Sequence, residues 1–592
     1  MNVRDIKVLL EPSGEDAALI KELTQLFDNY ETARGVWDEE VDEITSFVFA
    51  TDTKETTNSK LPFHNTTTIP KLAHIRNNLV VAYTSQLIPN SQWIQFAAND
   101  EADDSADVRQ AVEGYVRSKS AASELELTVN RLVQDWVDTG VAAAQTRYVN
   151  RKVRNGLGAM NSTYSGPDST RLDPRCVFWD ATASNIRDAN KVVRQVMSLG
   201  DLKQEVADDT GLLTEEQFQE IRETYSLLNS GGTGSAANQM KSNFAKAGFG
   251  EMEQYYSSNQ VELLTFYGTF YDTESDVLYQ NYKITIANRK VVLAKEPSSK
   301  WAAEGGLHIS IYETRRNCLI PISPLARVVG LQYKIDKLEN LRADVFDRIA
   351  NPPIVEIGDV TFTGTRGAPG SRYRVTEGGD VKELTSSTPV LSADMQINNA
   401  LSMMDDLTGN PREALGTRTP GEKTKFEVQI LDQGQNRMFR YNLRKFEIEM
   451  LNPILNDYLG LGRLYMDASD IIEIYGNDNI KISEFVNVTK ASLGSGGRIR
   501  ALGASIFSEK ANILQTLMTM LNGPVGQLLS PHVSRAKLYR AIERLGDLEG
   551  FDLFLQNIGV QEDMQTKTLA EKAQGSAQES SLTDTRLTEE GQ

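Results

Sequence analysis

Histidine and cysteine are both scarce in this chain of 592 residues, which has four histidines and two cysteines. Cys176 and Cys318 lie far apart, and neither has neighbours at metal-ligand spacing. No two of the histidines form an H-E-x-x-H pair. The sequence therefore predicts free thiols in a reducing compartment and gives no local signal for a metal site.

Long apolar runs are also missing. A typical run, residues 79–83, is far too short to cross a bilayer. The first residues, MNVRDIKVLLEPSGEDAALIKEL, contain no apolar stretch of the kind that defines a signal peptide. We therefore expect a soluble protein that is made in the cytoplasm and does not contact a membrane.

Basic residues are also fewer than acidic ones. The chain has 62 Lys and Arg against 81 Asp and Glu, which gives a formal net charge of −19. This balance argues against a protein that coats nucleic acid through a basic surface. It is compatible with a protein that lets DNA pass without gripping it. The 40% hydrophobic and 24% charged residues are typical of a folded chain with several domains.

Recognisable catalytic motifs are absent too. Residues 416–424, GTRTPGEKT, approach a phosphate-binding P-loop, but Glu422 separates the second glycine from Lys423 and Pro420 removes an amide. The acidic run at 100–107 lacks the ligand spacing of an EF-hand and predicts a solvated loop before a helix. We therefore expect no enzyme activity, no cofactor and no metal.

The first half of the chain predicts helices followed by strands. Helical spacing of apolar residues covers 15–50, 70–88 and a long stretch that ends near 140. Two further helices are expected within 198–228, followed by a mobile insertion at 230–258. Residues 260–320 are rich in β-branched and aromatic residues and predict antiparallel strands.

The second half predicts two long helices around a small β unit. Residues 324–351 place apolar side chains on one face of a helix about 40 Å long, which Pro352 and Pro353 end. These apolar positions are Val328, Leu331, Ile335, Leu338, Leu341, Val345 and Ile349. Glycine-linked strands at 354–386 and a helix at 392–407 come next.

A loop of helix breakers at 408–421 precedes a very long helix expected at 423–459, with Gly434 as a bend. The apolar face of this helix includes Phe439, Leu443, Phe446, Met450, Ile454 and Tyr458. Strands at 464–490, short helices at 500–550 and a disordered tail from about 563 complete the prediction.

This order of elements resembles the portal proteins of tailed phages, and podovirus-type portals in particular. Four local stretches carry the likeness: Arg171–Ala183, Leu338–Ile357, Thr419–Val428 and Glu449–Ile454. The resemblance implies an α+β portal fold of wing, stem, clip and crown regions that assembles as a dodecameric ring around a central channel. It covers roughly residues 65–480.

The regions that the resemblance implies follow one another along the chain. They are an N-terminal helical arm (1–65), the first part of the wing (66–322, with the insertion near 230–258), a stem helix (323–351), the clip (352–386), a second stem helix (387–408), the tunnel loop (409–423), the long helix with the second part of the wing (424–493), the crown (494–562) and a disordered tail (563–592).

The resemblance also implies a function without an active site. Double-stranded DNA would pass through the ring during packaging and ejection, and the residues expected near it in the tunnel loop are Arg412, Thr417, Arg418, Thr419, Lys423 and Lys425. The basic members of this set are candidates for transient phosphate contact, and pairing with acids of neighbouring subunits is an equal alternative.

The clip carries the expected partner interface. Arg366, Arg372 and Arg374 would face the large terminase first and a head–tail adaptor or tail protein later, although a solvated surface is the alternative. Major capsid and scaffolding proteins complete the implied partners, and the implied location is the portal vertex of the virion. Two other classes of function stay open: a non-channel virion component, such as a tail adaptor or internal core protein, and a packaging enzyme.

Overall fold

A computed structural model gives the fold of much of the chain. It describes residues 16–49, 67–88, 93–99, 106–154, 160–207, 215–228, 260–272, 276–297, 306–350, 354–358, 360–363, 372–383, 391–408, 438–466, 469–475, 483–494, 496–501 and 517. Helices and strands are mixed, in agreement with the expected α+β class. Nearly all of these residues belong to one compact unit, Met1–Ile474 with Phe485–Ala501.

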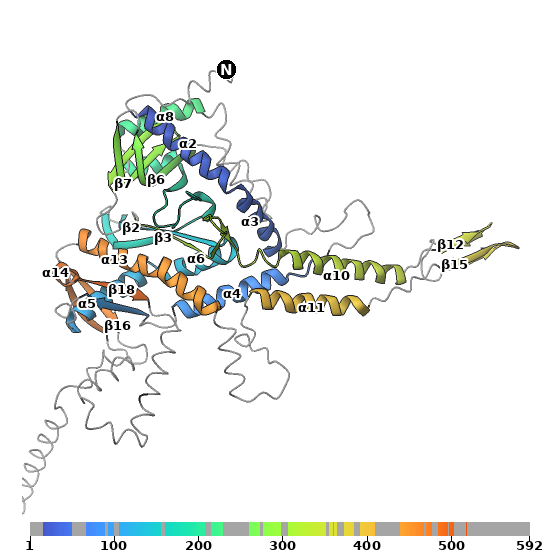
Figure 1. The fold of residues 1–592 in the computed structure, drawn as a ribbon. Helices are drawn as coiled ribbons and strands as arrows, with labels where there is room; N and C mark the ends of the chain where they lie inside the picture. Colours follow the sequence, from blue (N-terminus) through green and yellow to red (C-terminus); the bar gives the residue numbers. More distant parts are fainter. Residues whose placement is uncertain are drawn as a thin grey trace, which may run out of the picture. The chain divides into compact units, whose positions relative to one another are not determined.

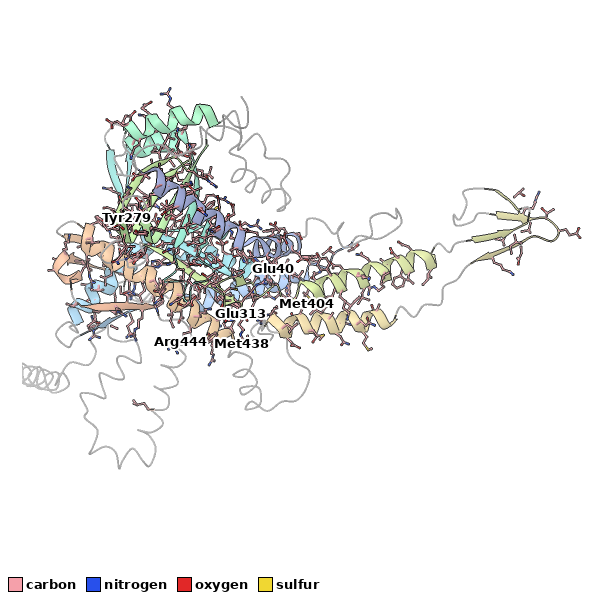
Figure 2. All side chains as sticks on the ribbon, turned by 45° about the horizontal axis from the view of Figure 1, so that its top comes forward. Glu40, Tyr279, Glu313, Met404, Met438 and Arg444 are labelled. Carbon is pink, nitrogen blue, oxygen red and sulfur yellow. The ribbon has the colours of Figure 1, made fainter. Side chains whose placement is uncertain are left out.

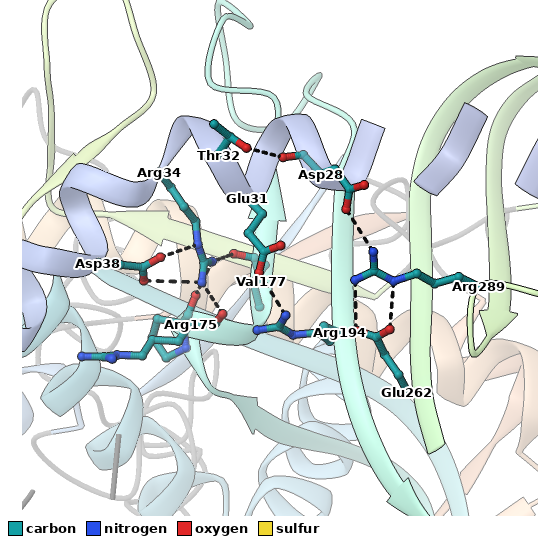
Figure 3. Close-up of polar contacts among 11 residues, drawn as sticks. Asp28, Glu31, Thr32, Arg34, Asp38, Arg175, Val177, Arg194, Glu262 and Arg289 are labelled. Atoms are coloured by element: carbon teal, nitrogen blue, oxygen red, sulfur yellow. Dashed lines mark hydrogen bonds and ion pairs between the residues drawn. The ribbon is translucent and has the colours of Figure 1, made fainter. Parts of the chain in front are cut away.

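The helical spacing of 15–50 is confirmed by two N-terminal helices, α2 (Ala17–Ala33) and α3 (Gly35–Val48). They pack on the two main β-sheets described below and on the helical core. Arg34, at the junction of the two helices, anchors them. Its guanidinium donates to the carbonyl oxygens of Pro174, Arg175 and Val177 and pairs with Asp38 at 3.2 Å (Figure 3). The arm is therefore held by buried polar contacts as well as by apolar packing.

Three helices form the centre of the largest core: α4 (Lys71–Leu87), α5 (Ala106–Ala122) and α6 (Leu125–Thr139). The helix expected at 70–88 begins directly after Pro70, as predicted. The single long helix expected up to 140 is instead broken into α5 and α6. Glu124 has a φ of 54°, which is a left-handed conformation that ends α5 and starts α6 in a new direction.

The β structure consists mainly of two antiparallel sheets. The five-stranded sheet has the order β4 (Val177–Trp179), β5 (Lys191–Ser198), β6 (Gln260–Asp272), β7 (Val277–Ala287) and β8 (Val291–Pro297). The three-stranded sheet has the order β3 (Met160–Leu172), β2 (Val141–Arg154) and β9 (Leu307–Ile311). A tight turn joins β7 to β8, and Asn288 and Arg289 in this turn both have positive φ.

Smaller elements complete this part. Helices α7 (Leu199–Ala207) and α8 (Glu215–Leu228) confirm the two helices expected within 198–228 and cover the sheet near β8. A 3₁₀ turn, η1 (Pro174–Cys176), precedes β4, and the short strands β10 (Glu313–Thr314) and β11 (Pro321–Ile322) pair with each other. The insertion expected at 230–258 lies outside the described residues.

Two helices flank four short strands in the next part of the chain. Helix α10 (Val329–Ala350) and helix α11 (Leu391–Thr408) run side by side (Figure 1). Between them in sequence, β12 (Ile354–Ile357) pairs with β15 (Asp380–Glu383), and β13 (Val360–Thr363) pairs with β14 (Arg372–Val375). The helix predicted at 324–351, the strands predicted at 354–386 and the helix predicted at 392–407 are therefore all confirmed.

The last described part begins inside the expected long helix. Residues 438–446 are helical, a π-helical turn η2 (Glu447–Leu451) follows, and α13 (Asn452–Tyr465) continues. All six residues predicted for the apolar face are buried. The irregularity in this helix lies at η2, whereas the bend expected at Gly434 lies outside the described residues.

The chain then returns to strands, as predicted. Strand β16 (Ser469–Tyr475) pairs with β17 (Ser483–Thr489), and the short helix α14 (Lys490–Leu493) leads into β18 (Gly497–Ala501). Strand β18 pairs with β1 (Ile94–Ala98), which is 400 residues earlier in the chain. Within the described residues, no helix is long and apolar enough to span a membrane. The helices expected at 500–550 and the tail after 563 fall almost entirely outside the described part.

Candidate functional site

The candidate site is the pair of helices α10 and α11, together with α4, which contacts both. Two charged residues join these helices. Arg342 of α10 donates to Asp394 of α11 at 2.5 Å and to Glu339 at 2.6 Å. Lys71 of α4 pairs with Asp405 of α11 at 2.9 Å. Each of the three helices is thus tied to another by an ion pair.

The apolar stripe of α10 is buried at its start and exposed at its end. Val328 and Ile335 have no exposed surface, whereas Ile349, on the same stripe, is 53% exposed. The two helices together expose six large apolar side chains: Leu341, Phe346 and Ile349 on α10, and Met395, Met403 and Leu407 on α11. Met404, labelled in Figure 2, is by contrast buried. Helix α10 therefore buries the first part of its apolar stripe in the core and exposes the last part, whereas α11 exposes apolar side chains at both ends. We call α10 and α11 together the helical hairpin.

A second stripe of α10 is polar and also buried. It consists of Gln332, Asp336, Asn340 and Asp344, which recur every four residues and are all less than a tenth exposed. We call these four residues the polar ladder. Residues spaced by four lie above one another on a helix, so the ladder forms one continuous line along α10.

The polar ladder binds the backbone of the segment that leads into α4. The amide of Leu72 donates to Gln332 Oε1 at 3.2 Å, and that of Ile69 donates to Asp336 Oδ1 at 3.2 Å. The amide of Thr67 donates to Asn340 Oδ1 at 2.8 Å, while Gln332 Nε2 donates back to the Ile69 carbonyl at 2.7 Å. Burial raises the pKa of Asp336 to about 6, above its ordinary value of 3.8.

The four strands between the helices form two separate two-stranded sheets. In the β13–β14 hairpin, Thr361 lies opposite Arg374 and Thr363 lies opposite Arg372. Because alternate positions of a strand point to the same face, both arginine positions share one face of the hairpin. The Arg374 side chain is exposed. Arg366, the third expected clip residue, lies outside the described residues.

The residues expected to contact DNA are not in the described part of the chain. Arg412, Thr417, Arg418, Thr419, Lys423 and Lys425 all fall between Thr408 and Met438. The structure describes the two ends of this stretch, which are the end of α11 and the helical residues from 438 onward. Both ends carry exposed apolar side chains, at Leu407 and Met438.

Aromatic residues fix the helix that leaves this stretch. Phe439 stacks on Tyr83 of α4 with ring centroids 4.4 Å apart, and Phe446 meets Trp136 of α6 edge-on at 5.1 Å. Asn442 donates to the hydroxyl of Tyr312 at 2.7 Å. Residues 438–446 are therefore rigidly attached to α4 and α6, the same helical core that holds the base of α10.

The π-helical turn η2 carries a buried acid. Glu447 is 4% exposed, and its Oε1 atom has no hydrogen-bond partner among the described residues. Burial raises the pKa of Glu447 to about 7, and the positive charge of Arg444, labelled in Figure 2, only partly opposes this. Glu449, in the same turn, accepts a hydrogen bond from Ser310 of β9 at 2.9 Å.

Glu447→Gln is expected to stabilise the protein at pH 8. The folded chain holds the proton of Glu447 more tightly than the unfolded chain does, so the free energy of unfolding falls as pH rises from about 4.5 to about 7. The amide has no charge to bury, and the gain at pH 8 is at most about 3 kcal/mol. Urea unfolding at pH 5 and pH 8 tests this: a variant with the wild-type pH dependence would contradict it.

Sequence reasoning missed the polar ladder, the Arg34 anchor and the acid in η2. The ladder was present as a repeat of polar residues every four positions between 332 and 344, inside a helix whose apolar stripe was recognised. Its partner, the segment from Thr67 to Leu72, is more than 250 residues earlier in the chain. No local pattern connects the two.

Two comparisons with known proteins found no match. No protein-family model matches the chain, and no curated protein is significantly similar to it. Among the described residues, no group of three or more His, Cys, Asp and Glu side chains is placed to hold a metal ion. The functional argument therefore rests on the two helices, the strands between them and the sequence pattern.

Proposed function

We propose that this chain is the portal protein of a tailed phage, the ring-shaped conduit through which double-stranded DNA is packaged and ejected. The observation that carries the proposal is the uncovered apolar surface on the last part of α10 and on α11. Phe346 and Ile349 are each more than half exposed. Both residues lie on α10, the first helix in the order helix, small β unit, helix and long helix. In the family that the sequence resembles, the helix at this place in the order belongs to the stem.

A second copy of the same hairpin is the partner that suits this surface. Full burial of a large apolar side chain contributes roughly 1.5–3 kcal/mol, so six half-exposed side chains per subunit offer a substantial gain when copies pack side by side. Repeated head-to-tail contacts between identical copies form a closed ring when the rotation from one copy to the next divides a full turn evenly. Twelve is the number of copies that the resemblance implies.

The charge of the chain suits a channel in which DNA must slide. Twelve copies of a chain with net charge −19 would carry roughly −230. Most of the inner surface would then repel phosphates. Arg412, Arg418, Lys423 and Lys425 of the tunnel loop would supply the few transient contacts, or would pair with acids of neighbouring subunits.

The strands between α10 and α11 are proposed as the docking face for other proteins. Arg372 and Arg374 share one face of the β13–β14 hairpin, and arginine is enriched at protein interfaces. The partners would be the large terminase during packaging and a head–tail adaptor or tail protein afterwards. The proposed location is the portal vertex of the virion, in contact with capsid and scaffolding proteins.

The mass of the purified full-length protein tests assembly. Sedimentation velocity should give a single large species near twelve times 65.8 kDa, roughly 790 kDa. A monomer or dimer under all assembly conditions would contradict the proposal. An ATPase assay on the same sample separates the packaging-enzyme alternative, because hydrolysis that survives purification requires an active site that a conduit does not need.

A further inference from the structure

We propose that Thr67–Leu72 is a latch, meaning a segment whose backbone binds the polar ladder of α10 and can detach from it without unfolding either helix. The charge of Asp336 determines how strongly this segment binds. The latch lies at the point where α4 joins α10. It would govern how firmly the core is coupled to the helical hairpin. The inference goes beyond the proposed function and holds whether or not the chain forms a ring.

The contacts of the latch are of a kind that can open locally. Residues 67–70 have no regular secondary structure, and three of the latch amides bond to side chains rather than to a helix or sheet backbone. Each of these hydrogen bonds can be exchanged for one to water without unfolding α4 or α10. Segments of this kind belong to the low-stability end of a folded protein.

Among the described residues, no cation is paired with the Asp336 carboxylate at the centre of the ladder. The ladder residues one turn away, Gln332 and Asn340, are neutral, and the acid Asp344 lies two turns away. Gln332 Nε2 donates to Asp336 Oδ1 at 2.8 Å, while Asp336 Oδ2 has no hydrogen-bond partner among the described residues. The charged group that α4 places nearest in sequence, Lys71, pairs with Asp405 of α11 at 2.9 Å. The titratable His74 of α4 is exposed and bonds to Asn78 at 3.1 Å.

The charge of Asp336 therefore weakens the closed latch. An asparagine would accept the same amide from Ile69 without a buried charge. Burial in the closed latch raises the pKa of Asp336 from 3.8 to about 6, and an open latch that exposes the carboxyl group to water would return it towards 3.8. The latch should therefore be tightest below pH 4, loosen as pH rises to about 6, and be constant above that. Each pKa unit corresponds to a factor of ten, and the closed-to-open ratio should fall about a hundredfold across this window.

Hydrogen–deuterium exchange of the full-length protein, followed by mass spectrometry, tests the latch. The readout is the protection of peptides that cover residues 67–72, corrected for the intrinsic pH dependence of exchange. In the wild type, protection should fall at least tenfold between pH 4.5 and pH 7.5. In Asp336→Asn it should be the same at both values and should exceed the wild type at pH 7.5. Equal protection and equal pH dependence in the two proteins would overturn the proposal.

Two further variants separate the latch from general effects on α10. Asp347→Asn removes an exposed charge from the same helix and should keep the wild-type pH dependence. Asn340→Leu removes the acceptor of the Thr67 amide and should lower protection of the latch at both pH values while α10 itself stays protected. Unchanged protection of the latch in Asn340→Leu would show that the ladder does not hold it.

Discussion

Phe346→Lys is expected to abolish ring assembly while leaving the fold of each subunit intact. The Phe346 side chain is 54% exposed on α10, so a lysine can reach water there without disturbing the core. When a second hairpin covers this face, however, the charge is buried without a partner, which costs several kcal/mol at each interface. A closed ring contains this interface once per subunit, so the penalty is repeated around the ring.

Sedimentation velocity and circular dichroism measure this outcome together. The variant should sediment as a monomer or small oligomer with the helical signal of the wild type. Asp347→Lys is the matched control, since it places the same side chain at the next position of α10, off the apolar stripe, and should still assemble. Rings formed by Phe346→Lys at the wild-type protein concentration would contradict the role given to the apolar face of α10 and α11.

Arg34→Ala is expected to detach the N-terminal arm from the β-sheet. The Arg34 side chain is 7% exposed, and its guanidinium carbon lies 3.8 Å from the centre of the Phe178 ring. Its guanidinium donates to the carbonyl oxygen of Val177 at 2.8 Å and to those of Pro174 and Arg175, and the alanine variant loses all three hydrogen bonds. Loss of one partner from a buried charged network of this kind costs about 3–5 kcal/mol.

Hydrogen–deuterium exchange across α2 and α3 gives the measurement. Both helices should lose most of their protection in Arg34→Ala, whereas α13, which the arm does not hold, should keep its own. Lys21→Ala is the control, because Lys21 is exposed on α2 and its removal leaves the anchor intact. An arm that stays fully protected in Arg34→Ala would show that apolar packing alone holds it.

The sequence predicted those features whose signals are local. The apolar face from Phe439 to Tyr458 was identified from spacing alone, because each member contributes to one stripe of one helix. The end of α10 was predicted from Pro352 and Pro353, and the end of α11 from the helix-breaking residues at 408–421. Strands β2 and β3 were not predicted, since Val141–Ala144 is alanine-rich and Met160–Leu172 contains polar residues, glycine and proline.

The candidate site was only partly predictable for the same reason. The exposed half of the α10 stripe could be recognised as apolar but not as uncovered, because burial depends on where α4 and the helix after residue 438 pack. The polar ladder and the Arg34 anchor both bind backbone groups that are at least 140 residues away in the chain. Long-range pairing of this kind leaves no trace in the spacing of either segment.

End-on negative-stain images of the purified full-length protein test the central claim most directly. The account predicts closed rings with a single subunit number and a central hole about as wide as a DNA duplex. Rings without a hole of that width, or compact particles of one or two subunits, would contradict it and would favour a tail adaptor or an internal core protein.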